Sequence, residues 1–333
     1  MKVYIDPACN ILYSSFYIIG IKEYYGKNNV HFSNKEYFKD FSFNNQFFSF
    51  VTQDHNNIKK VIIDFADSSD INQKALRWCD VYGKINLAEE DFNLSKKIIP
   101  IGPSFGVKIY SLFDTLTFSV LNYLKSYNRI GNKRLFFSNY KSQFKRIKLK
   151  DYSFKINKEN YIYFIATLWK KEEKTNTERA NFIKACKTSN LVNFEGGFAP
   201  RSRDDMPDFK YLTLSTRVTM KDYLLKINKS AIAFNTPAVL DCHGWKLAEF
   251  LCLGKVIVST KLSRKLPKPL LNNEDFLITD GTKDDLQNKI EYILKNESVR
   301  IKMQENARKY FNNELAPKSV IKRLDNSLQK LPL

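Results

Sequence analysis

The sequence predicts an α/β fold made of two doubly wound, Rossmann-like domains. Two observations predict it. At 333 residues, the chain is longer than one ordinary domain of about 100–200 residues. Short apolar runs also alternate with amphipathic helical patterns along both halves, which is typical of strands joined by crossover helices. We therefore expect two α/β domains of similar size, each with its own core.

Each half of the chain repeats this alternation several times. In the first half, apolar runs at residues 3–5, 61–65 and 98–101 precede helical patterns at 13–25, 70–79 and 116–125. In the second half, apolar runs lie at 161–168, 192–195, 231–234, 256–258 and 276–278, and helical patterns lie at 178–187, 220–227, 244–253, 283–294 and 298–311. Because helices rather than short turns follow the strands, we expect parallel sheets.

A basic segment separates the two halves. From Arg129 to Lys158 it holds ten Lys and Arg residues against one acid, Asp151, with aromatic residues interleaved. It is either a surface for anionic lipid or an acidic acceptor, or a solvated edge hairpin whose aromatic side chains pack inward. We place an N-terminal domain at residues 1–157, a C-terminal domain at 158–312, and a last helix, opened by Pro317, within 313–333. This C-terminal helix can pack back on the N-terminal domain.

The charge balance indicates an anionic partner. The chain has 54 Lys and Arg residues against 35 acids, a formal net charge of +19. Such a charge attracts nucleic acid, anionic lipid or an acidic sugar donor. The amino-acid bias of an AT-rich genome is an alternative source of part of this excess.

The cysteines and the hydropathy bear on the compartment. The five cysteines form no Cys-x-x-Cys pair, which indicates reduced thiols in a reducing compartment. No signal-peptide pattern and no run of about 18 apolar residues occurs. We expect a cytoplasmic protein whose contact with the inner face of the plasma membrane is peripheral.

One stretch, residues 230–260, carries the features of an anion site. It predicts a strand, a loop, a helix and a second strand, and the loop at 235–243 includes Thr236. Ligands of open α/β sheets bind at the carboxyl ends of the strands, where this loop lies. Gly244 lets the backbone approach a ligand, and the amides of Trp245 and Lys246 open a helix whose positive end attracts a diphosphate.

Two carboxylates lie close to the start of this helix in the sequence. Asp241 lies in the loop before the helix, and Glu249 lies inside an otherwise apolar helix. A carboxylate is costly to bury without a partner, and a ribose diol would satisfy it with two hydrogen bonds. The alternative is that Glu249 lies at the helix flank and pairs with solvent or a lysine.

This arrangement resembles the Glu-x7-Glu motif of the family 4 glycosyltransferases and their group 1 relatives. The pattern here is Asp241-x7-Glu249, with Gly244 in the glycine position, followed by the turn Leu-Gly-Lys-Val-Ile-Val. The resemblance extends over about residues 160–315 and is closest to bacterial transferases of capsule, O-antigen or lipopolysaccharide synthesis. It implies the GT-B fold, in which an N-terminal acceptor-side domain and a C-terminal donor domain face a cleft.

The resemblance also implies an activity and roles for the motif residues. It implies a hexosyl- or deoxyhexosyl-transferase that moves a sugar from a nucleotide-sugar donor to a glycan or lipid-linked acceptor, with retention and with no metal or other cofactor. Glu249 would hold the donor ribose, and Asp241 would contact the transferred sugar. Gly244, Trp245 and Lys246 would lie against the diphosphate, and Thr236 would lie in the same donor site.

The sequence departs from the family pattern in three places. Residue 241 is Asp rather than Glu, which shortens the side chain by a methylene. The Arg and Lys that usually follow the first strand of the donor domain are missing, and Arg179 and Arg217 are the candidates to replace them. An N-domain histidine facing the sugar is also missing, and His243 can substitute electrostatically.

The N-terminal half offers acceptor-side candidates. The loop after its first strand contains Asp6, and Ser14 and Ser15 follow shortly afterwards. In a GT-B fold this region would face the cleft.

Two other classes of protein remain open. A nucleotide-sugar epimerase, or another GT-B protein that transfers no sugar, would share the donor site. A basic nucleic-acid-binding protein would account for the charge, but no helix-turn-helix, zinc-finger or aromatic RNA-binding signature occurs, so we expect no nucleic-acid partner.

Overall fold

The computed structural model describes residues 1–201 and 205–329. The chain folds into two α/β units, and the predicted α/β fold is confirmed. Unit 1 contains Met1–Asp151, Arg264–Lys268 and the C-terminal segment from Asn313; unit 2 contains Tyr152–Ser263 and Pro269–Asn312. None of the helices in the described residues is long and apolar enough to cross a membrane.

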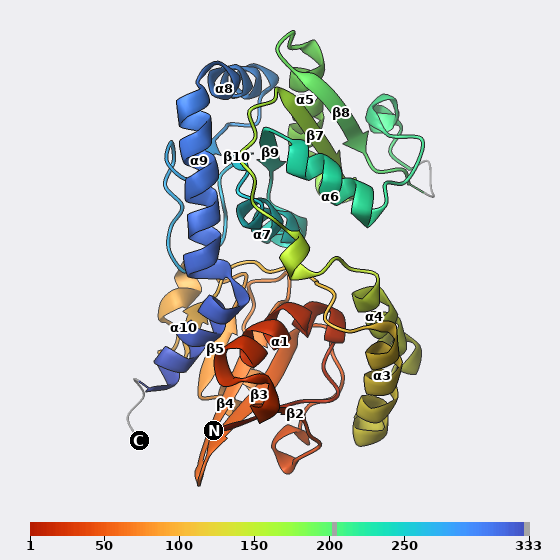
Figure 1. Cartoon of the computed structure of the whole chain (residues 1–333), viewed down its shortest axis with the longest axis vertical. Helices are drawn as coiled ribbons and strands as arrows, with labels where there is room; N and C mark the ends of the chain where they lie inside the picture. The colour runs from red at the N-terminus through yellow and green to blue at the C-terminus, as the bar shows by residue number, and fades with distance from the viewer. Residues whose placement is uncertain (202–204, 330–333) are drawn as a thin grey trace. The chain divides into compact units, whose positions relative to one another are not determined.

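Unit 1 is built on a six-stranded sheet with the order β2-β1-β3-β4-β5-β6 (Figure 1). Its strands are β1 (Lys2–Ile5), β2 (Val30–Phe32), β3 (Phe47–Asp54), β4 (Asn57–Asp64), β5 (Val81–Lys84) and β6 (Ile98–Pro100). The prediction of a parallel sheet is wrong for β3, which is antiparallel to both of its neighbours. The reason is a tight hairpin: Asp54 pairs with Asn57, so only two residues form the turn, and one of them, His55, has a φ of 50°.

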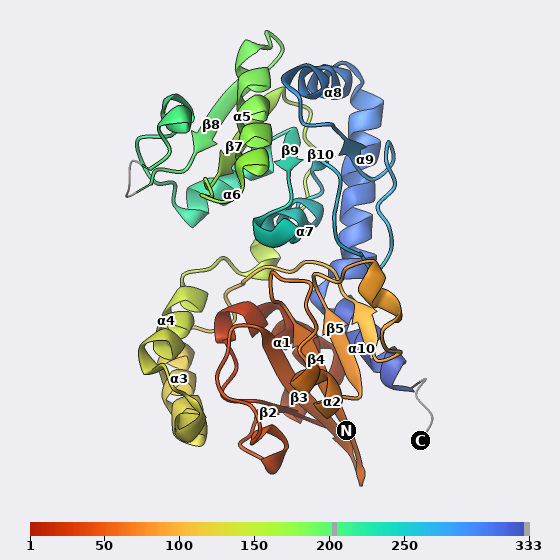
Figure 2. The same ribbon diagram turned by 180° about the vertical axis from the view of Figure 1, so that it is seen from behind.

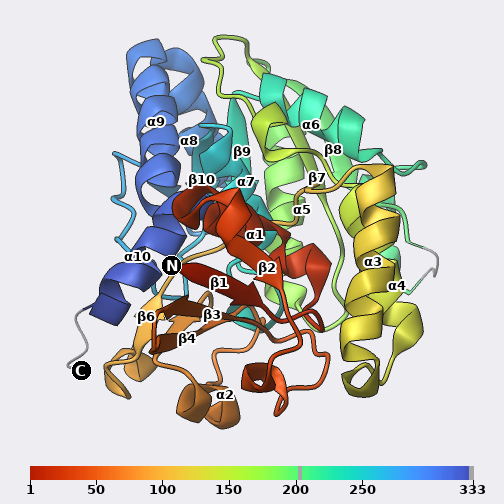
Figure 3. The same ribbon diagram turned by 60° about the horizontal axis from the view of Figure 1, so that its bottom comes forward.

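The helices of unit 1 are α1 (Ile11–Tyr25), α2 (Gln73–Trp78), α3 (Leu112–Ser126), α4 (Lys133–Phe144) and α10 (Pro317–Gln329). Figure 3 shows α1 on one side of the strands and α2 on the other. α3 and α4 pack against each other, and α4 also packs against α1. The basic segment after Arg129 therefore contains a helix rather than an edge hairpin, and its aromatic residues Phe136 and Tyr140 are buried.

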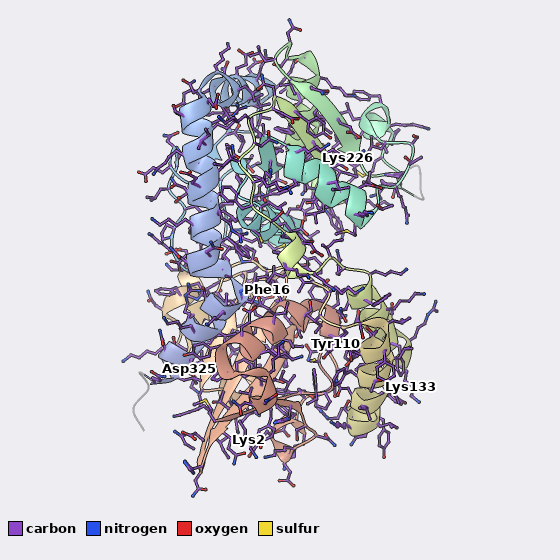
Figure 4. All side chains as sticks on the ribbon, in the orientation of Figure 1. Lys2, Phe16, Tyr110, Lys133, Lys226 and Asp325 are labelled. Atoms are coloured by element: carbon purple, nitrogen blue, oxygen red, sulfur yellow. The ribbon has the colours of Figure 1, made fainter. Side chains whose placement is uncertain are left out.

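The predicted last helix, α10, lies in unit 1 and packs on α1. The contact is close because α1 has a glycine there: a Cβ added at Gly20 would lie 2.3 Å from the carbonyl oxygen of Pro317. The hydroxyls of Tyr24 and Tyr25 donate hydrogen bonds to the carboxylate of Asp325, at 2.9 and 2.7 Å. Figure 4 labels Asp325 on α10.

Unit 2 contains only parallel strand pairs among its described residues. Its strands are β7 (Tyr161–Ala166), β8 (Asn193–Phe198), β9 (Ile232–Asn235), β10 (Val256–Ser259) and β11 (Leu277–Ile278). β7 pairs with β8, and β9, β10 and β11 form a second ladder. β7 lies beside β9, because the amide of Ala231 donates to the carbonyl of Tyr161 at 2.8 Å. The spatial order is therefore β8-β7-β9-β10-β11.

The helices of unit 2 are α5 (Glu173–Thr188), α6 (Met220–Lys229), α7 (Trp245–Cys252), α8 (Lys283–Lys295) and α9 (Glu297–Tyr310). α5 and α8 pack together on one face of the strands, whereas α6 lies on the other face, as the views from the front and from behind show (Figures 1 and 2). After β7 the chain enters α5, and after β9 it enters α7 on the α6 side. The two connections thus diverge between β7 and β9, which makes this point the topological switch of the sheet.

Candidate functional site

A cavity of about 160 Å³ lies at the switch point of unit 2. It is bordered by the residues at the ends of β7 and β9, by the start of α7 and by one side chain of α5. Its lining includes five residues that the sequence predicts for the donor site: Arg179, Thr236, Gly244, Trp245 and Lys246. Residues separated by up to 67 positions in the sequence are thus brought together at the place where open α/β sheets bind ligands.

Arg179 extends from α5 into this cavity and is held in a fixed orientation. Its Nε donates to the hydroxyl of Thr236 at 3.0 Å, and its Nη1 donates to the carbonyl of Thr167 at 2.9 Å. The side chain is 9% exposed, and burial lowers the pKa of Arg179 to about 10. The guanidinium therefore remains charged at neutral pH.

Lys246 lies in the first turn of α7 and lines the same cavity. Its ammonium donates to the carbonyl of Ile165, and burial, followed by the charge of Arg179, lowers the pKa of Lys246 to about 8. Gly244 is the N-cap of this helix and provides no side-chain cap. Within residues 1–201 and 205–329, no carboxylate lies within 4.0 Å of either cation. A bound anion would relieve the repulsion between the two cations.

A second cavity, of about 540 Å³, lies next to the first and shares Thr167 and Trp169 with it. Arg217, the other predicted replacement cation, lines this second cavity rather than the first. Arg201 lies there too, and its guanidinium donates two hydrogen bonds to the carboxylate of Asp205, at 2.8 and 3.0 Å. The two cavities follow the carboxyl edge of the sheet from β8 to β9.

Asp241 and His243 lie in the loop that leads into α7, and neither of them lines these cavities. Asp241 is exposed and has a φ of 57°, and its carbonyl accepts a hydrogen bond from the hydroxyl of Ser263. His243 is buried. The two predicted catalytic residues therefore lie in the same loop, but only Asp241 is exposed to solvent.

Glu249 lies in α7 one turn after Lys246 and is buried, 5% exposed. Its carboxylate accepts a hydrogen bond from the hydroxyl of Tyr223 at 2.8 Å and a longer one from Tyr152 at 3.5 Å. The sequence suggests two alternatives for Glu249: a contact with a ribose diol, or a solvated position at the helix flank. These tyrosine partners fit neither of them. Glu249 is not among the residues that line the switch-point cavity.

The acceptor-side candidates lie inside unit 1. The carboxylate of Asp6 forms a bidentate ion pair with Arg129, with contacts of 2.6 and 3.1 Å. Ser15 donates to the carbonyl of Leu12 at 2.8 Å and accepts from the amide of Val107 at 3.0 Å. Ser14 is fully buried. This geometry gives no support to a contact between these three residues and an acceptor.

Sequence reasoning missed Trp169 as a site residue. It follows β7, is 40% exposed and lines both cavities. A tryptophan directly after a strand that ends at a binding edge is a signal that the sequence contains, since exposed aromatic rings at such edges can stack on a flat ligand. The ring is therefore a further candidate for contact with a base.

No family model matches the chain, and no curated protein matches it. Among solved structures, a TarM mutant from S. aureus in complex with fondaparinux, alpha-GlcNAc-glycerol and UDP is similar at 12% identity, covering 80% of this chain and 48% of that chain, with a TM-score of 0.43. The chain thus spans about half the length of that TarM chain. A glycosyltransferase from Rickettsia africae is similar at 12% identity, 79% and 69% coverage and a TM-score of 0.43. HepE of Anabaena in complex with UDP is similar at 9% identity, 75% and 72% coverage and a TM-score of 0.43.

Proposed function

We propose that this protein is a GT-B glycosyltransferase that binds the diphosphate of a nucleotide-sugar donor in the cavity at the switch point of unit 2. The observation that carries the proposal is the meeting of Arg179, Lys246 and the first amides of α7 around one cavity. Two cations and a helix N-terminus form an environment that favours a dianionic group. The roles of Asp241 and Glu249 in the motif that resembles the family 4 transferases belong to the same proposal.

The proposed chemistry needs little more than charge stabilisation. When a sugar leaves its diphosphate, negative charge develops on the leaving oxygen, and positioned cations and amides stabilise it. Arg179, whose orientation two hydrogen bonds fix, would hold the diphosphate, and Lys246 would neutralise the charge that develops. Asp241 and His243 would contact the transferred sugar, with retention of configuration and without a metal. Arg217 would extend the donor site along the sheet edge.

The acceptor and the biological role belong to the proposal as well. We expect a glycan or lipid-linked acceptor in bacterial capsule, O-antigen or lipopolysaccharide synthesis, and a hexosyl or deoxyhexosyl donor. The alternatives are an epimerase or another GT-B protein that binds the donor without transferring its sugar. An assay for transfer to an added acceptor, compared with an assay for donor epimerisation, distinguishes them.

A thermal-shift panel with UDP, GDP, CMP and inorganic pyrophosphate tests the donor site. We expect one nucleotide to raise the melting temperature, because a ligand at 100 times its Kd stabilises the folded state by about 2.7 kcal/mol. Lys246→Met should remove most of this shift. The control Lys187→Met, which changes an exposed lysine at the C-terminal end of α5, should leave the shift intact. A shift that both variants retain would mean that the nucleotide binds elsewhere.

The same panel separates the roles of phosphate and ribose. If Glu249 contacts the ribose, Glu249→Gln should weaken the response to the nucleotide and leave the response to pyrophosphate unchanged. Gln keeps an acceptor for the hydroxyl of Tyr223, so the variant should fold. Equal loss of both responses would instead indicate that Glu249 only supports α7.

A further inference from the structure

Helix α3 carries its large apolar side chains on its outer face. Phe113 is 76% exposed, Leu116 is 60% exposed and Leu124 is 61% exposed. The fully buried residues of α3 are all polar: Thr115, Ser119, Asn122 and Ser126. This is the reverse of an ordinary surface helix, which buries its apolar stripe and exposes its polar residues.

The exposed side chains form one continuous stripe. Phe113, Leu116, Val120 and Leu124 are spaced by three or four residues, so they line one side of the helix over about 16 Å. Leu112, Leu121 and Tyr127 are exposed beside them. Single exposed apolar residues are normal on a protein surface, but a continuous apolar surface of this kind marks an interaction site.

The stripe lies outside the contacts that α3 makes with the rest of unit 1. Those contacts include the half-buried ring of Phe118, which stacks on Tyr110 with ring centroids 4.9 Å apart, as well as polar ones. The side-chain amide of Asn122 donates to the hydroxyl of Tyr140 at 2.9 Å in a fully buried layer. On α4, the side-chain amide of Gln143 is buried and has no hydrogen-bond partner among the described residues. Within unit 1, the side chains of the stripe remain exposed.

Positive charge borders the stripe. The exposed Phe137 of α4 lies against Tyr123 of α3, with ring centroids 5.3 Å apart, and the ammonium of Lys133 lies 5.8 Å from the same Tyr123 ring. Figure 4 labels Lys133 at the outer edge of α4. Residues 111–150 contain nine Lys and Arg against a single acid, Asp114. At Lys133, this basic segment lies directly beside α3.

We propose that α3 is an interfacial helix that inserts its apolar stripe between the headgroups of an anionic bilayer, while the basic side chains of α4 contact lipid phosphates. An amphipathic helix with an apolar face and basic neighbours binds in this way through buried apolar area and attraction to anionic lipid. A second copy of the chain is the less favoured occupant, because it would bring two basic surfaces together. The proposal is independent of the proposed transferase function.

Vesicle co-sedimentation of the full chain tests this proposal. The probes are vesicles of phosphatidylcholine alone and of phosphatidylcholine mixed with phosphatidylglycerol. We expect binding to the mixed vesicles only. The triple variant Phe113→Gln, Leu116→Gln, Leu124→Gln should bind about tenfold more weakly. Its matched control, Leu225→Gln, changes a leucine of α6 that is 55% exposed and should bind like the wild type.

A second variant and a second readout distinguish insertion of the helix into the bilayer from electrostatic adhesion to its surface. They also distinguish it from misfolding of the triple variant. Lys133→Gln, Arg134→Gln, Lys141→Gln should reduce the preference for phosphatidylglycerol and the sensitivity to salt. A polarity-sensitive fluorophore at Leu116→Cys should shift to the blue on mixed vesicles, whereas the same label at Leu225→Cys should not. The proposal is overturned if the wild type does not bind mixed vesicles, if the triple variant binds them equally well, or if the stripe instead forms a dimer that the triple variant abolishes.

Discussion

At the scale of single residues, the two cations of the candidate site differ in how they respond to pH. Arg179 remains charged throughout the neutral range, although burial lowers its pKa to about 10. Lys246 has a pKa near 8, because burial and the neighbouring guanidinium both disfavour its charged form. Of these two cations, only Lys246 changes its charge near neutral pH.

We predict that nucleotide affinity falls as the pH rises through about 8. Below this pH the ammonium of Lys246 is charged and can pair with a diphosphate; above it the charge is lost. Since a hydrogen bond to a charged group contributes about 1.5 kcal/mol, affinity should fall about tenfold between about pH 7 and pH 9. Titration calorimetry across this range measures the fall. Lys246→Met should bind weakly with no such dependence, and an equally steep fall in that variant would assign the dependence to another group.

Arg129 belongs to a buried ion pair of unit 1. Its guanidinium pairs with Asp6 and also donates to the carbonyls of Phe38 and Phe41, at 2.9 and 2.8 Å. Arg129→Met would leave the carboxylate of Asp6 buried without its cation. We expect a loss of about 3–5 kcal/mol in the free energy of unfolding, measured by chemical denaturation.

Two further variants test whether this loss of stability arises from the buried ion pair. Adding Asp6→Asn should recover part of the loss, because the uncompensated charge is then removed as well. Lys133→Met, a change of an exposed basic residue of α4, should have little effect. If the loss for Arg129→Met were as small as that for Lys133→Met, the ion pair would not stabilise unit 1.

At the scale of elements, glycine determines how closely α10 docks on α1. A methyl group at position 20 would overlap the backbone of Pro317, so the helices must separate to accept it. We predict that Gly20→Ala destabilises unit 1 by about 1–3 kcal/mol and increases hydrogen exchange in α10. At Gly131, a Cβ would have no neighbour within 4 Å, so Gly131→Ala is the matched control and should leave both measurements unchanged. Unchanged exchange in Gly20→Ala would contradict the close docking.

Local sequence patterns were sufficient to predict most elements. The helices at α1, α5, α6, α7 and α8 and the strands at β7, β9 and β10 follow the predicted apolar runs and periodicities. β3 was missed although its residues are apolar, because the two-residue turn after Asp54 places a hairpin where a crossover was expected. Sequence alone could not show the outward stripe of α3 either, because its orientation depends on tertiary contacts with α4, such as the hydrogen bond from Asn122 to Tyr140.

The candidate site was predictable where its residues are close together in the sequence. Gly244, Trp245 and Lys246 lie in one strand–loop–helix pattern, and the structure brings them to the switch-point cavity. The partners of Glu249 were not predictable, because Tyr152 lies 97 residues away and Tyr223 lies 26 residues away. Such contacts are fixed by tertiary packing and not by local spacing.

At the scale of the whole molecule, the net charge of +19 makes electrostatic attraction to anions general, so a response to charge alone does not define a site. Two basic regions are separate on the chain: the cavity with Arg179 and Lys246 in unit 2, and the border of α3 in unit 1. A nucleic-acid-binding protein would respond mainly to oligonucleotides, with affinity that falls steeply with salt. A nucleotide-sugar enzyme would instead distinguish one base from the others.

The most direct test of the central claim is titration calorimetry of nucleoside diphosphates into the wild type, Lys246→Met and Lys187→Met. A nucleotide site at the switch point of unit 2 predicts one-to-one binding of a preferred nucleotide, retained in Lys187→Met and lost or weakened at least about tenfold in Lys246→Met. Binding that is equal in all three proteins, or no binding of any nucleoside diphosphate to the wild type, would contradict it.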